Sequence, residues 1–463
     1  MKPTVLLLLF ALIYNVESFM NVYRRIATEE SDGDAGDPLF LTPLIEQGKV
    51  KEAQDRAKVQ FPGFKGVQSY AGYYTVNKAK GSNQFLWYFP AKYAAKTSPV
   101  VLWLQGGPGA TSLIGLFTEN GPFKATKNGI ELRKFTWSMN HHLIFIDNPV
   151  GTGYSFTKNG YAKNESDVGR DLYSTLTQFF TMFPSLQNND FYIAGESYAG
   201  KYVPAIGYTI YKNNPSAKLK INLKGLSIGN GLSDPEHQLK YSDYLYQLGL
   251  IDDNMKKTVK SYEKQGVEYI QNKQWVEAFQ LFDNLLNGDL NNHTSIFKNA
   301  TGFENYFNYL VAEDLSKDIE YMGKFIQSTA VRKALHVGNI PFNGIGQEVE
   351  VNLMEDVMQS VAPWISELLS HYPVLIYNGQ LDIIVAYPLT INYLNNLDFS
   401  AAEEYKTAKR YIWKVNGDIA GYVKHAGNLT EVLVRNAGHM VPTDQPLWAF
   451  DLITRFTHKK KLY

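Results

Sequence analysis

Residues 191–200, Phe-Tyr-Ile-Ala-Gly-Glu-Ser-Tyr-Ala-Gly, join a short apolar run to a cluster of small residues. The apolar run predicts the end of a buried strand, and the small residues two places before and after Ser197 predict a sharp turn into a helix. Such a turn holds a serine side chain above the edge of a sheet, beside the N-terminus of the following helix. Ser197 is therefore a candidate nucleophile for attack on a carbonyl group, and a buried turn serine is the alternative.

A second segment, Gly225–Gly229, matches Gly-x-Ser-x-Gly more closely by letter than Gly195–Ala199 does. It continues into residues 230–235, a turn-rich run with no helix start. Because the nucleophile motif needs a strand, a turn and a helix in that order, we expect Ser227 to lie inside a strand.

Strands and helices alternate over most of the chain, which predicts an α/β fold with a mostly parallel central sheet covered by helices on both faces. From about 236 to 326 the chain instead shows helical spacing and no clear strand, which predicts a helical cap insertion in a catalytic core of 19–235 and 327–463. The expected strands are 100–104, 142–146, 191–194, 223–228, 373–378 and 431–435, with a hairpin from 69–76 and 84–89 and helices near 45–59, 168–183 and 446–456.

The N-terminus carries Lys2, an apolar run over 5–14 and a small-residue cleavage pattern at 16–18. This combination predicts a signal peptide over 1–18 and places the protein in the secretory pathway, with a lysosome, a vesicular granule or the extracellular space as the destination. No later run is long and apolar enough to span a membrane, so no membrane span is expected.

Composition limits the classes of partner and cofactor. The formal net charge is zero, so nothing favours a nucleic acid or an anionic membrane as partner. Cysteine is absent, which excludes disulfides and thiol catalysis. We expect no cofactor and no metal, since none of the nine histidines begins His-x-x-Glu. Four sequons are candidate glycosylation sites: Asn164, Asn292, Asn299 and Asn428.

A serine nucleophile needs a base, and the base needs an acid that fixes its tautomer. Asp382 follows the strand expected at 373–378, and His439 follows the strand expected at 431–435. The chain order Ser197, Asp382, His439 is that of the α/β-hydrolases, and all three lie just past the carboxyl ends of strands. The ordered trio predicts a Ser-His-Asp triad, against the alternatives of a loop histidine and a helix-capping aspartate.

An oxyanion formed on the substrate needs two backbone N–H donors fixed in advance. The residue after the nucleophile, Tyr198, supplies one such donor. Gly107, in the glycine-rich loop after the strand at 100–104, is the natural second. One alternative is that these glycines form a plain turn. A phosphate-binding loop is the other, but no Gly-Lys-Ser/Thr follows them.

Residues 103–109, 147–153, 195–200, 228–231 and 438–442 are five motif segments that follow one another along the chain. Together they resemble the serine carboxypeptidases, in family order. Gln105 and residues 379–385 look most like the vitellogenic-like carboxypeptidase branch. The family commonly has Asn where Gln105 stands and Cys where Ala110 and Val385 stand, so its usual disulfides cannot form here.

The resemblance implies an α/β-hydrolase fold with a helical cap, release of C-terminal residues from peptides or proteins with a free C-terminus, and the triad and oxyanion hole described above. It also implies that the terminal carboxylate is surrounded by Trp103, Gln105, Gly106, Glu119 and Glu196. Since an ionised glutamate would repel that carboxylate, two close carboxyls must share a proton, and acidic pH should favour binding. The alternative is that Glu196 faces solvent and Glu119 only precedes a turn.

Other functions stay open at this stage. An esterase or acyltransferase would need the same triad without a carboxylate clamp. A partner-stabilising or storage protein would not need the triad at all. A homodimer is also left open.

Overall fold

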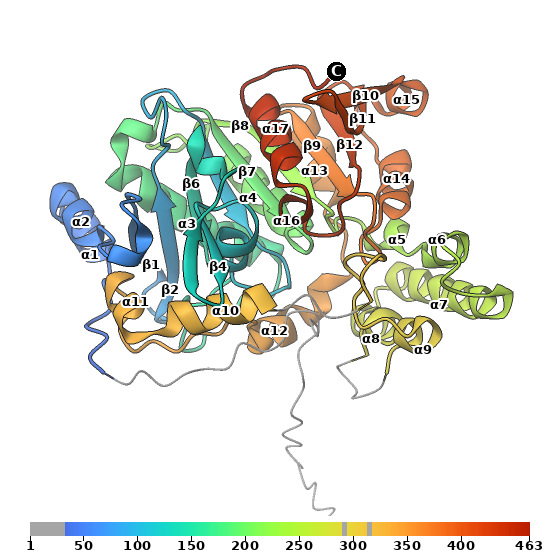
Figure 1. Ribbon diagram of the computed structural model, residues 1–463, viewed down its shortest axis with the longest axis horizontal. Coiled ribbons are helices and arrows are strands. Elements are labelled where there is room, and N and C mark those ends of the chain that lie inside the picture. The colour runs from blue at the N-terminus through green and yellow to red at the C-terminus, as the bar shows by residue number, and fades with distance from the viewer. Residues whose placement is uncertain (1–32, 289–293, 313–316) are drawn as a thin grey trace, which may run out of the picture.

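The structure is a computed structural model that describes residues 33–288, 294–312 and 317–463. Its largest element is a sheet of ten strands in the order β1-β2-β6-β3-β7-β8-β9-β12-β11-β10, and β4 and β5 form a separate hairpin (Figure 1). The strands are β1 (Tyr70–Asn77), β2 (Ser82–Phe89), β3 (Val100–Leu104), β4 (Phe123–Thr126), β5 (Gly129–Leu132), β6 (His142–Ile146), β7 (Phe191–Glu196), β8 (Leu223–Gly229), β9 (Val374–Gly379), β10 (Arg410–Val415), β11 (Asp418–Ala426) and β12 (Leu429–Val434).

The six central strands, from β6 through β3, β7, β8 and β9 to β12, are parallel to one another, whereas the strands outside them, β1 and β2 on one side and β11 and β10 on the other, pair antiparallel. The predicted mostly parallel sheet is therefore confirmed. The carboxyl ends of the central strands meet at one edge of the sheet, which is where α/β proteins place their sites. The expected hairpin is also present, with Tyr70 opposite Tyr88 in β1 and β2.

Helices and short helical turns fill the connections between the strands. They are α1 (Thr42–Glu46), α2 (Val50–Ala57), α3 (Glu165–Met182), α4 (Ala199–Asn213), α5 (Pro235–Gln238), α6 (Tyr241–Gln247), α7 (Asp253–Gln271), α8 (Trp275–Leu286), α9 (Ile296–Thr301), α10 (Lys317–Gln327), α11 (Thr329–Ala334), α12 (Gln347–Val357), α13 (Ala362–Leu369), α14 (Tyr387–Asn396), α15 (Ala402–Thr407), α16 (Val441–Asp444), α17 (Pro446–Thr457), the 3-10 turns η1 (Pro62–Phe64), η3 (Trp137–Met139) and η4 (Pro184–Leu186), and the π-helical turn η2 (Gly115–Glu119).

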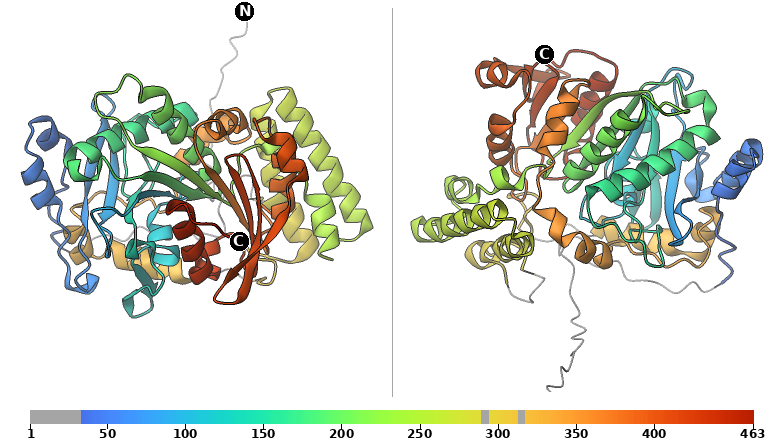
Figure 2. Two further views of the ribbon diagram at one scale, coloured as in Figure 1. Left: turned by 90° about the horizontal axis from the view of Figure 1, so that it is seen from above. Right: turned by 180° about the vertical axis from the view of Figure 1, so that it is seen from behind.

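Both faces of the sheet are covered, so its central strands are mostly apolar and largely buried. Helices α3 and α4 pack against each other and against strands on one face, seen from behind in Figure 2. Helix α17 covers the other face, where the Phe456 ring lies 5.6 Å from the ring of Tyr192. Every residue of β3, β6 and β7 is buried, because each of these strands carries apolar side chains toward both helical layers.

The segment predicted as a cap contains only helices and loops within its described residues. Helices α6, α7, α8 and α9 project from the side of the molecule away from β1 (Figures 1 and 2). Helix α10, which the predicted insertion of 236–326 largely includes, instead contacts β4 and η2 beside the sheet. The division of the chain into core and cap stays a prediction.

Two expectations need correction. The helix predicted near 45–59 is two helices, α1 and α2, because Gly48 between them adopts a left-handed φ of +72°, which a continuing helix cannot contain. The antiparallel pair β10 and β11, which extends the sheet at one edge, was not predicted.

No helix in the described ranges combines the length and the apolar character that a membrane span requires. The predicted signal peptide, 1–18, lies outside the described residues.

Candidate active site

Ser197 occupies the turn between β7 and α4, with a left-handed φ of +61° and 8% of its surface exposed. The small neighbours are needed because the backbone doubles back on itself. A Cβ on Gly195 would lie 2.7 Å from Leu104 O and 2.8 Å from the Cβ of Ala199. The strand, turn and helix expected around Ser197 are therefore present. Ser227 lies inside β8, as expected.

His439 and Asp382 come together at the carboxyl ends of β12 and β9. His439 Nδ1 lies 2.8 Å from Asp382 Oδ2, and both side chains are fully buried. Because a carboxylate only accepts, Nδ1 carries the proton and Nε2 is left as the acceptor of the imidazole. His439 Nε2 has no hydrogen-bond partner within the described residues, so Ser197 Oγ is not bonded to it in this structure. Bonds of this kind often tighten only when substrate is bound.

Three residues with no assigned role in the sequence hold this pair in place. Asn230, just past β8, donates from Nδ2 to Asp382 Oδ2 at 2.7 Å and accepts from Gly379 N–H. Tyr244 donates its hydroxyl to the carbonyl of Asp382 at 2.8 Å.

Phe307 supports the histidine from the other side. Its ring stacks on the His439 ring at 4.4 Å, and its carbonyl accepts from His439 N–H at 2.7 Å. The Asn-Gly turn after β8 signalled only a change of chain direction, and nothing in the sequence near Tyr244 or Phe307 indicated either contact.

The glycine loop after β3 lies directly against the serine turn. A Cβ on Gly106 would lie 2.5 Å from Tyr198 N and 2.7 Å from Ser197 Cβ, so only glycine permits this approach. Gly107 has a φ of +116°. The backbone of Gly106 and Gly107 is thus brought to the start of α4, where Tyr198 is the N-cap residue.

The four side chains expected around a substrate carboxylate form one buried group. Gln105 links two of them, because it accepts from Trp103 Nε1 at 3.0 Å and donates to Glu196 Oε1 at 2.8 Å. Trp103, Glu119 and Glu196 show 0% exposure, and Gln105 shows 1%. The alternative that Glu196 faces solvent is therefore wrong.

Burial disfavours the ionised form of both carboxyls in this group. It raises the pKa of Glu119 to about 7, although the polar side chains of Glu196 and Gln105 beside it oppose the shift. Burial also raises the pKa of Glu196 well above its usual range, and the nearby charge of Glu119 raises it further. A proton therefore resides on this pair at acidic and neutral pH.

Behind the serine turn, a buried lysine is paired with a carboxylate. Lys201 in α4 is 0% exposed, and its Nζ lies 2.6 Å from Asp356 Oδ2 at the end of α12. The same Nζ lies over the Tyr198 ring, 5.4 Å from its centroid. A third acid, Glu165 at the start of α3, is buried nearby, and its pKa is raised well above the usual range by burial and then by Asp356. Ionisable side chains from the three helices α3, α4 and α12 thus meet beside Tyr198, the residue that follows Ser197.

No group of three or more His, Asp or Glu side chains suited to a metal ion occurs within the described ranges. Three sequons can be placed. Asn164, Asn299 and Asn428 are exposed, while Asn292 lies outside the described residues. Asn164 also caps α3, since its side chain accepts from Asp167 N–H.

Comparison with known proteins decides the family. Residues 60–459 match the serine carboxypeptidase family. This chain belongs to that family. It is a serine-type carboxypeptidase, and therefore a hydrolase.

Relatives of this serine carboxypeptidase match it over almost its whole length. It is 57% identical to the venom serine carboxypeptidase of Apis mellifera, over 99% of this chain and 100% of that protein. It is 48% identical to the vitellogenic carboxypeptidase of Aedes aegypti, over 96% of this chain and 95% of the other. It is also 48% identical to the probable serine carboxypeptidase CPVL of Homo sapiens, over 96% and 94% of the two chains. The predicted resemblance is confirmed.

The fold has a counterpart among solved structures. The crystal structure of Kex1(delta)p, a prohormone-processing carboxypeptidase from Saccharomyces cerevisiae, matches this serine carboxypeptidase with a TM-score of 0.74. The match covers 88% of this chain and 96% of that chain at 23% identity. The expected α/β-hydrolase fold is thereby confirmed.

Proposed function

We propose that this serine carboxypeptidase releases C-terminal residues from peptides through an acyl-enzyme formed on Ser197, and that acidic pH favours the reaction. The observation that carries the proposal is the buried Asp382–His439 pair. It lies at the carboxyl end of the strands β9 and β12, in the same parallel set of strands as β7, which ends one residue before Ser197.

In this mechanism His439 Nε2 takes the proton of Ser197 Oγ as the oxygen attacks the scissile carbonyl. Asp382 holds the opposite ring nitrogen protonated and stabilises the imidazolium that forms. The N–H groups of Gly107 and Tyr198 donate to the oxyanion. His439 then gives its proton to the departing amine, which leaves as a free amino acid, and water releases the shortened peptide from the serine.

The buried group of side chains around Gln105, which includes both glutamates, would hold the terminal carboxylate of the substrate. A protonated Glu119 or Glu196 donates a hydrogen bond to it, and Gln105 has a second amide hydrogen available beside its bond to Glu196. The Gly106 N–H is the remaining donor. Trp103 positions Gln105 rather than touching the substrate, because its indole N–H already donates to the Gln105 oxygen.

The experiment that tests this function compares two peptides that differ only in a free or an amidated C-terminus. Mass spectrometry after incubation should show loss of single residues from the free acid and far slower cleavage of the amide. Equal cleavage of both would indicate a hydrolase without a carboxylate clamp, and no cleavage of either would contradict the proposal.

The shared proton predicts a specific pH dependence. KM for a free-acid peptide should be lowest at acidic pH and should rise above about pH 7, where the carboxyl pair begins to ionise. Below this pH the carboxyl pair keeps its proton and can donate a hydrogen bond to the carboxylate of the substrate. Above it, each negative charge that the pair gains repels that carboxylate, so KM rises with pH. Above the apparent pKa of the pair we expect up to about a tenfold rise in KM per pH unit.

The control for this profile is the amidated peptide, which has no carboxylate to repel. The variant Glu196→Gln keeps a neutral donor, so its KM for the free acid should rise less at neutral pH. Identical profiles for both peptides in both proteins would remove Glu119 and Glu196 from substrate recognition.

The glycine loop gives a second prediction. Gly107→Ala should lower kcat on the order of 10²- to 10³-fold, the usual cost of one oxyanion donor. A Cβ there would lie 2.6 Å from Gly109 N, so the loop must move and carry its N–H away from the oxyanion.

Gly129→Ala is the matched control for backbone strain. Gly129, in the β4–β5 hairpin, has a similar φ of +110° and open space around it. The two variants should lose stability, but only Gly107→Ala should lose kcat per folded molecule. If kcat survives in Gly107→Ala as well, the loop is structural only.

We further propose that the protein enters the secretory pathway and acts outside the cell or in a vesicle. Its N-terminal sequence supports this, as do relatives named for venom and for vitellogenesis. The exposed Asn164, Asn299 and Asn428 are then accessible for glycosylation. Peptide mapping before and after glycosidase treatment of the secreted protein would identify the modified sites.

A further inference from the structure

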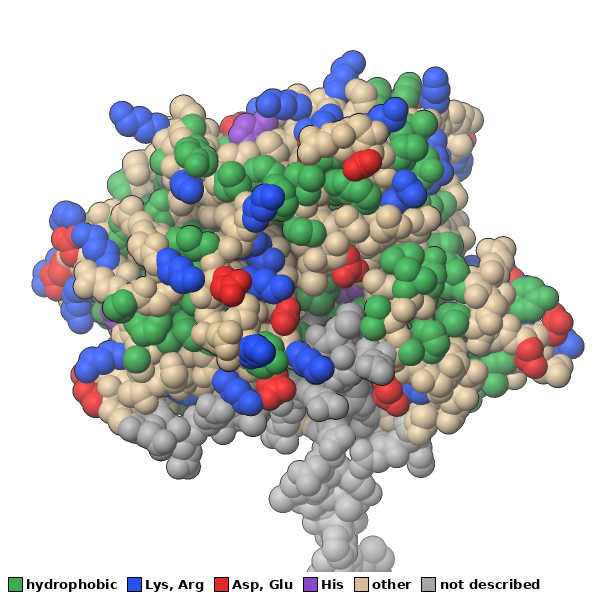
Figure 3. Space-filling view, in the orientation of Figure 1, with side chains coloured by type: hydrophobic (Ala, Val, Ile, Leu, Met, Phe, Trp, Pro, Cys, Tyr) green, Lys and Arg blue, Asp and Glu red, His purple; other side chains and the backbone are tan. Residues whose placement is uncertain are grey.

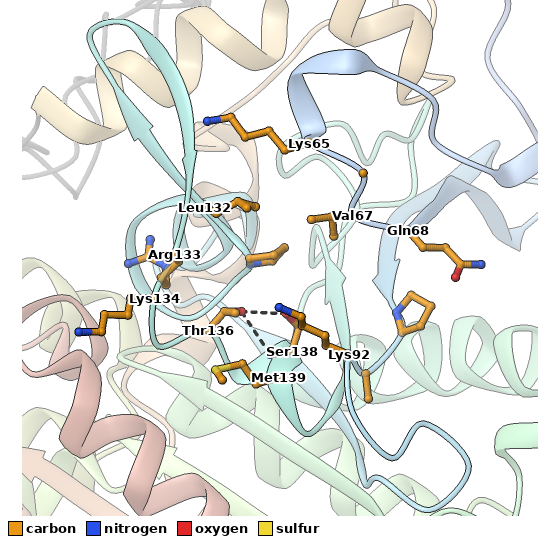
Figure 4. Close-up of a pocket in the computed structure, with 14 residues that line it drawn as sticks. Lys65, Val67, Gln68, Lys92, Leu132, Arg133, Lys134, Thr136, Ser138 and Met139 are labelled. Carbon is orange, nitrogen blue, oxygen red and sulfur yellow. Dashed lines mark hydrogen bonds between the residues drawn. The ribbon is translucent and has the colours of Figure 1, made fainter.

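A cavity of about 460 Å³ lies apart from the residues of the active site. It is lined by the residues that follow η1, the residues that follow β2, Pro122, the end of β5 with the residues after it, and η3 (Figure 4). Its volume falls in the range of small-molecule sites, about 300–1,000 Å³. None of the residues used in the proposed reaction lines it.

All charged side chains that line this cavity are positive. Lys65, Lys92, Arg133 and Lys134 line it, and none of its fourteen lining residues is Asp or Glu. The chain as a whole has a formal net charge of zero, so the positive charge is concentrated locally. Within the described part of the chain, the three lysines form no ion pair with a carboxylate, which leaves their charges available to a ligand.

Arg133 is the fixed cation of the cavity. Its Nη2 donates to Phe117 O at 2.8 Å and to Phe123 O at 3.2 Å, and its Nε donates to Gly121 O at 3.1 Å. Burial lowers its pKa to about 10, so it stays charged at acidic and neutral pH. Nη1 donates to no group among the residues that the structure describes. An anion there would meet a positive charge whose position is already fixed, which lowers the entropic cost of binding.

Apolar side chains line the same cavity. Val67, Leu132 and Met139 contribute to its wall, together with two prolines (Figure 4). Leu132 is 54% exposed, so about half of its surface is in contact with water. The apolar part of a ligand that covered Leu132 would remove this surface from water, which favours binding.

We propose that this cavity binds a small amphipathic organic anion. Its carboxylate, sulfonate or phosphate group lies among Lys65, Arg133 and Lys134, and its apolar part lies against Leu132 and Val67. The volume limits the ligand to a small molecule, the lining selects against cations, and the apolar wall selects against a simple inorganic ion.

The test uses a fluorescent pair of probes with one aromatic framework. The anion is 8-anilino-1-naphthalenesulfonate, and the neutral comparator is N-phenyl-1-naphthylamine. Each is titrated into the whole protein, into Lys65→Glu/Lys134→Glu, and into the control Lys218→Glu/Lys220→Glu, which reverses two exposed lysines after α4. Titrations at about 20 mM and about 300 mM NaCl separate charge from apolar contact, because salt screens only the former.

We expect saturable binding of the sulfonate that weakens at least about tenfold in Lys65→Glu/Lys134→Glu and is unchanged in the control, because two reversed charges cost more than about 1.4 kcal/mol. The neutral probe should bind more weakly, and sulfonate binding should weaken with salt. An unchanged Kd in the charge-reversed protein, equal affinity for the neutral probe, or no loss of affinity with salt would each overturn the proposal. If the charge-reversed protein does not fold, Lys65→Gln/Lys134→Gln and the salt titration of the unaltered protein decide the question.

Discussion

Ser197→Ala is expected to lower kcat by about 10⁴- to 10⁶-fold and to leave the fold intact. The hydroxyl is the only group removed, and alanine keeps the Cβ that already fits beside Gly106. Without the hydroxyl no acyl-enzyme forms, and only binding and the oxyanion donors remain to act on the peptide. Single-turnover kinetics on a free-acid peptide, together with a thermal melt, measure both effects.

The matched control is Ser227→Ala. Ser227 is 1% exposed within β8, and its hydroxyl has no hydrogen-bond partner within the described residues, so its loss should leave turnover nearly unchanged. A folded Ser197→Ala protein that turns over at the normal rate, or an inactive but folded Ser227→Ala protein, would contradict the assignment of the nucleophile.

Lys201→Met is expected to cost about 3–5 kcal/mol of the free energy of unfolding, because it leaves Asp356 as a buried carboxylate without its cation. Methionine fills much of the same volume, so the loss reports the charge rather than a cavity. Urea unfolding at neutral pH measures it. Tyr198 lies against both members of the pair, so a lower kcat should accompany the loss of stability.

The double variant Lys201→Met/Asp356→Leu separates the two contributions. Replacing a buried ion pair by apolar side chains is often neutral or stabilising, so much of the lost stability should return. A single variant that loses less than about 1 kcal/mol would show that Asp356 does not depend on Lys201.

The distribution of charge over the front of the molecule does not by itself single out the cavity. Lysine and arginine side chains are scattered over most of this face, and acidic side chains are interspersed among them (Figure 3). A basic cluster becomes distinctive only where the lining of one hollow contains no acid, as at the cavity beside Arg133.

Parts of the fold with strong local patterns were predictable. The parallel strands β3 and β6 are continuous apolar runs, because both of their faces are covered. β10 was missed because it is an edge strand with little apolar pattern, in which Arg410 and Ile412 are exposed. The break between α1 and α2 depends on Gly48, which adopts a positive φ. A glycine permits such a φ but does not require it, so its presence in a sequence is a weaker signal of a helix end than a proline would be.

The candidate site also has a part that the sequence could predict and a part that it could not. Ser197, Asp382 and His439 could be proposed from the sequence because each follows a strand and their order is characteristic. The contact between His439 and Asp382 needed the structure, as did the support from Asn230, Tyr244 and Phe307. Those three residues approach the pair from segments far apart in the chain, so no local pattern indicates them.

The sequence by itself thus determined the fold class, the family and the candidates for catalysis, because apolar periodicity and short turn motifs are local properties of the chain. Only the tertiary structure decided that Glu119 and Glu196 are fully buried beside Gln105, that Lys201 and Asp356 pair beneath Tyr198, and that four cations surround one cavity. These features depend on desolvation and on charges brought together from distant segments. Neither exists until the chain has packed.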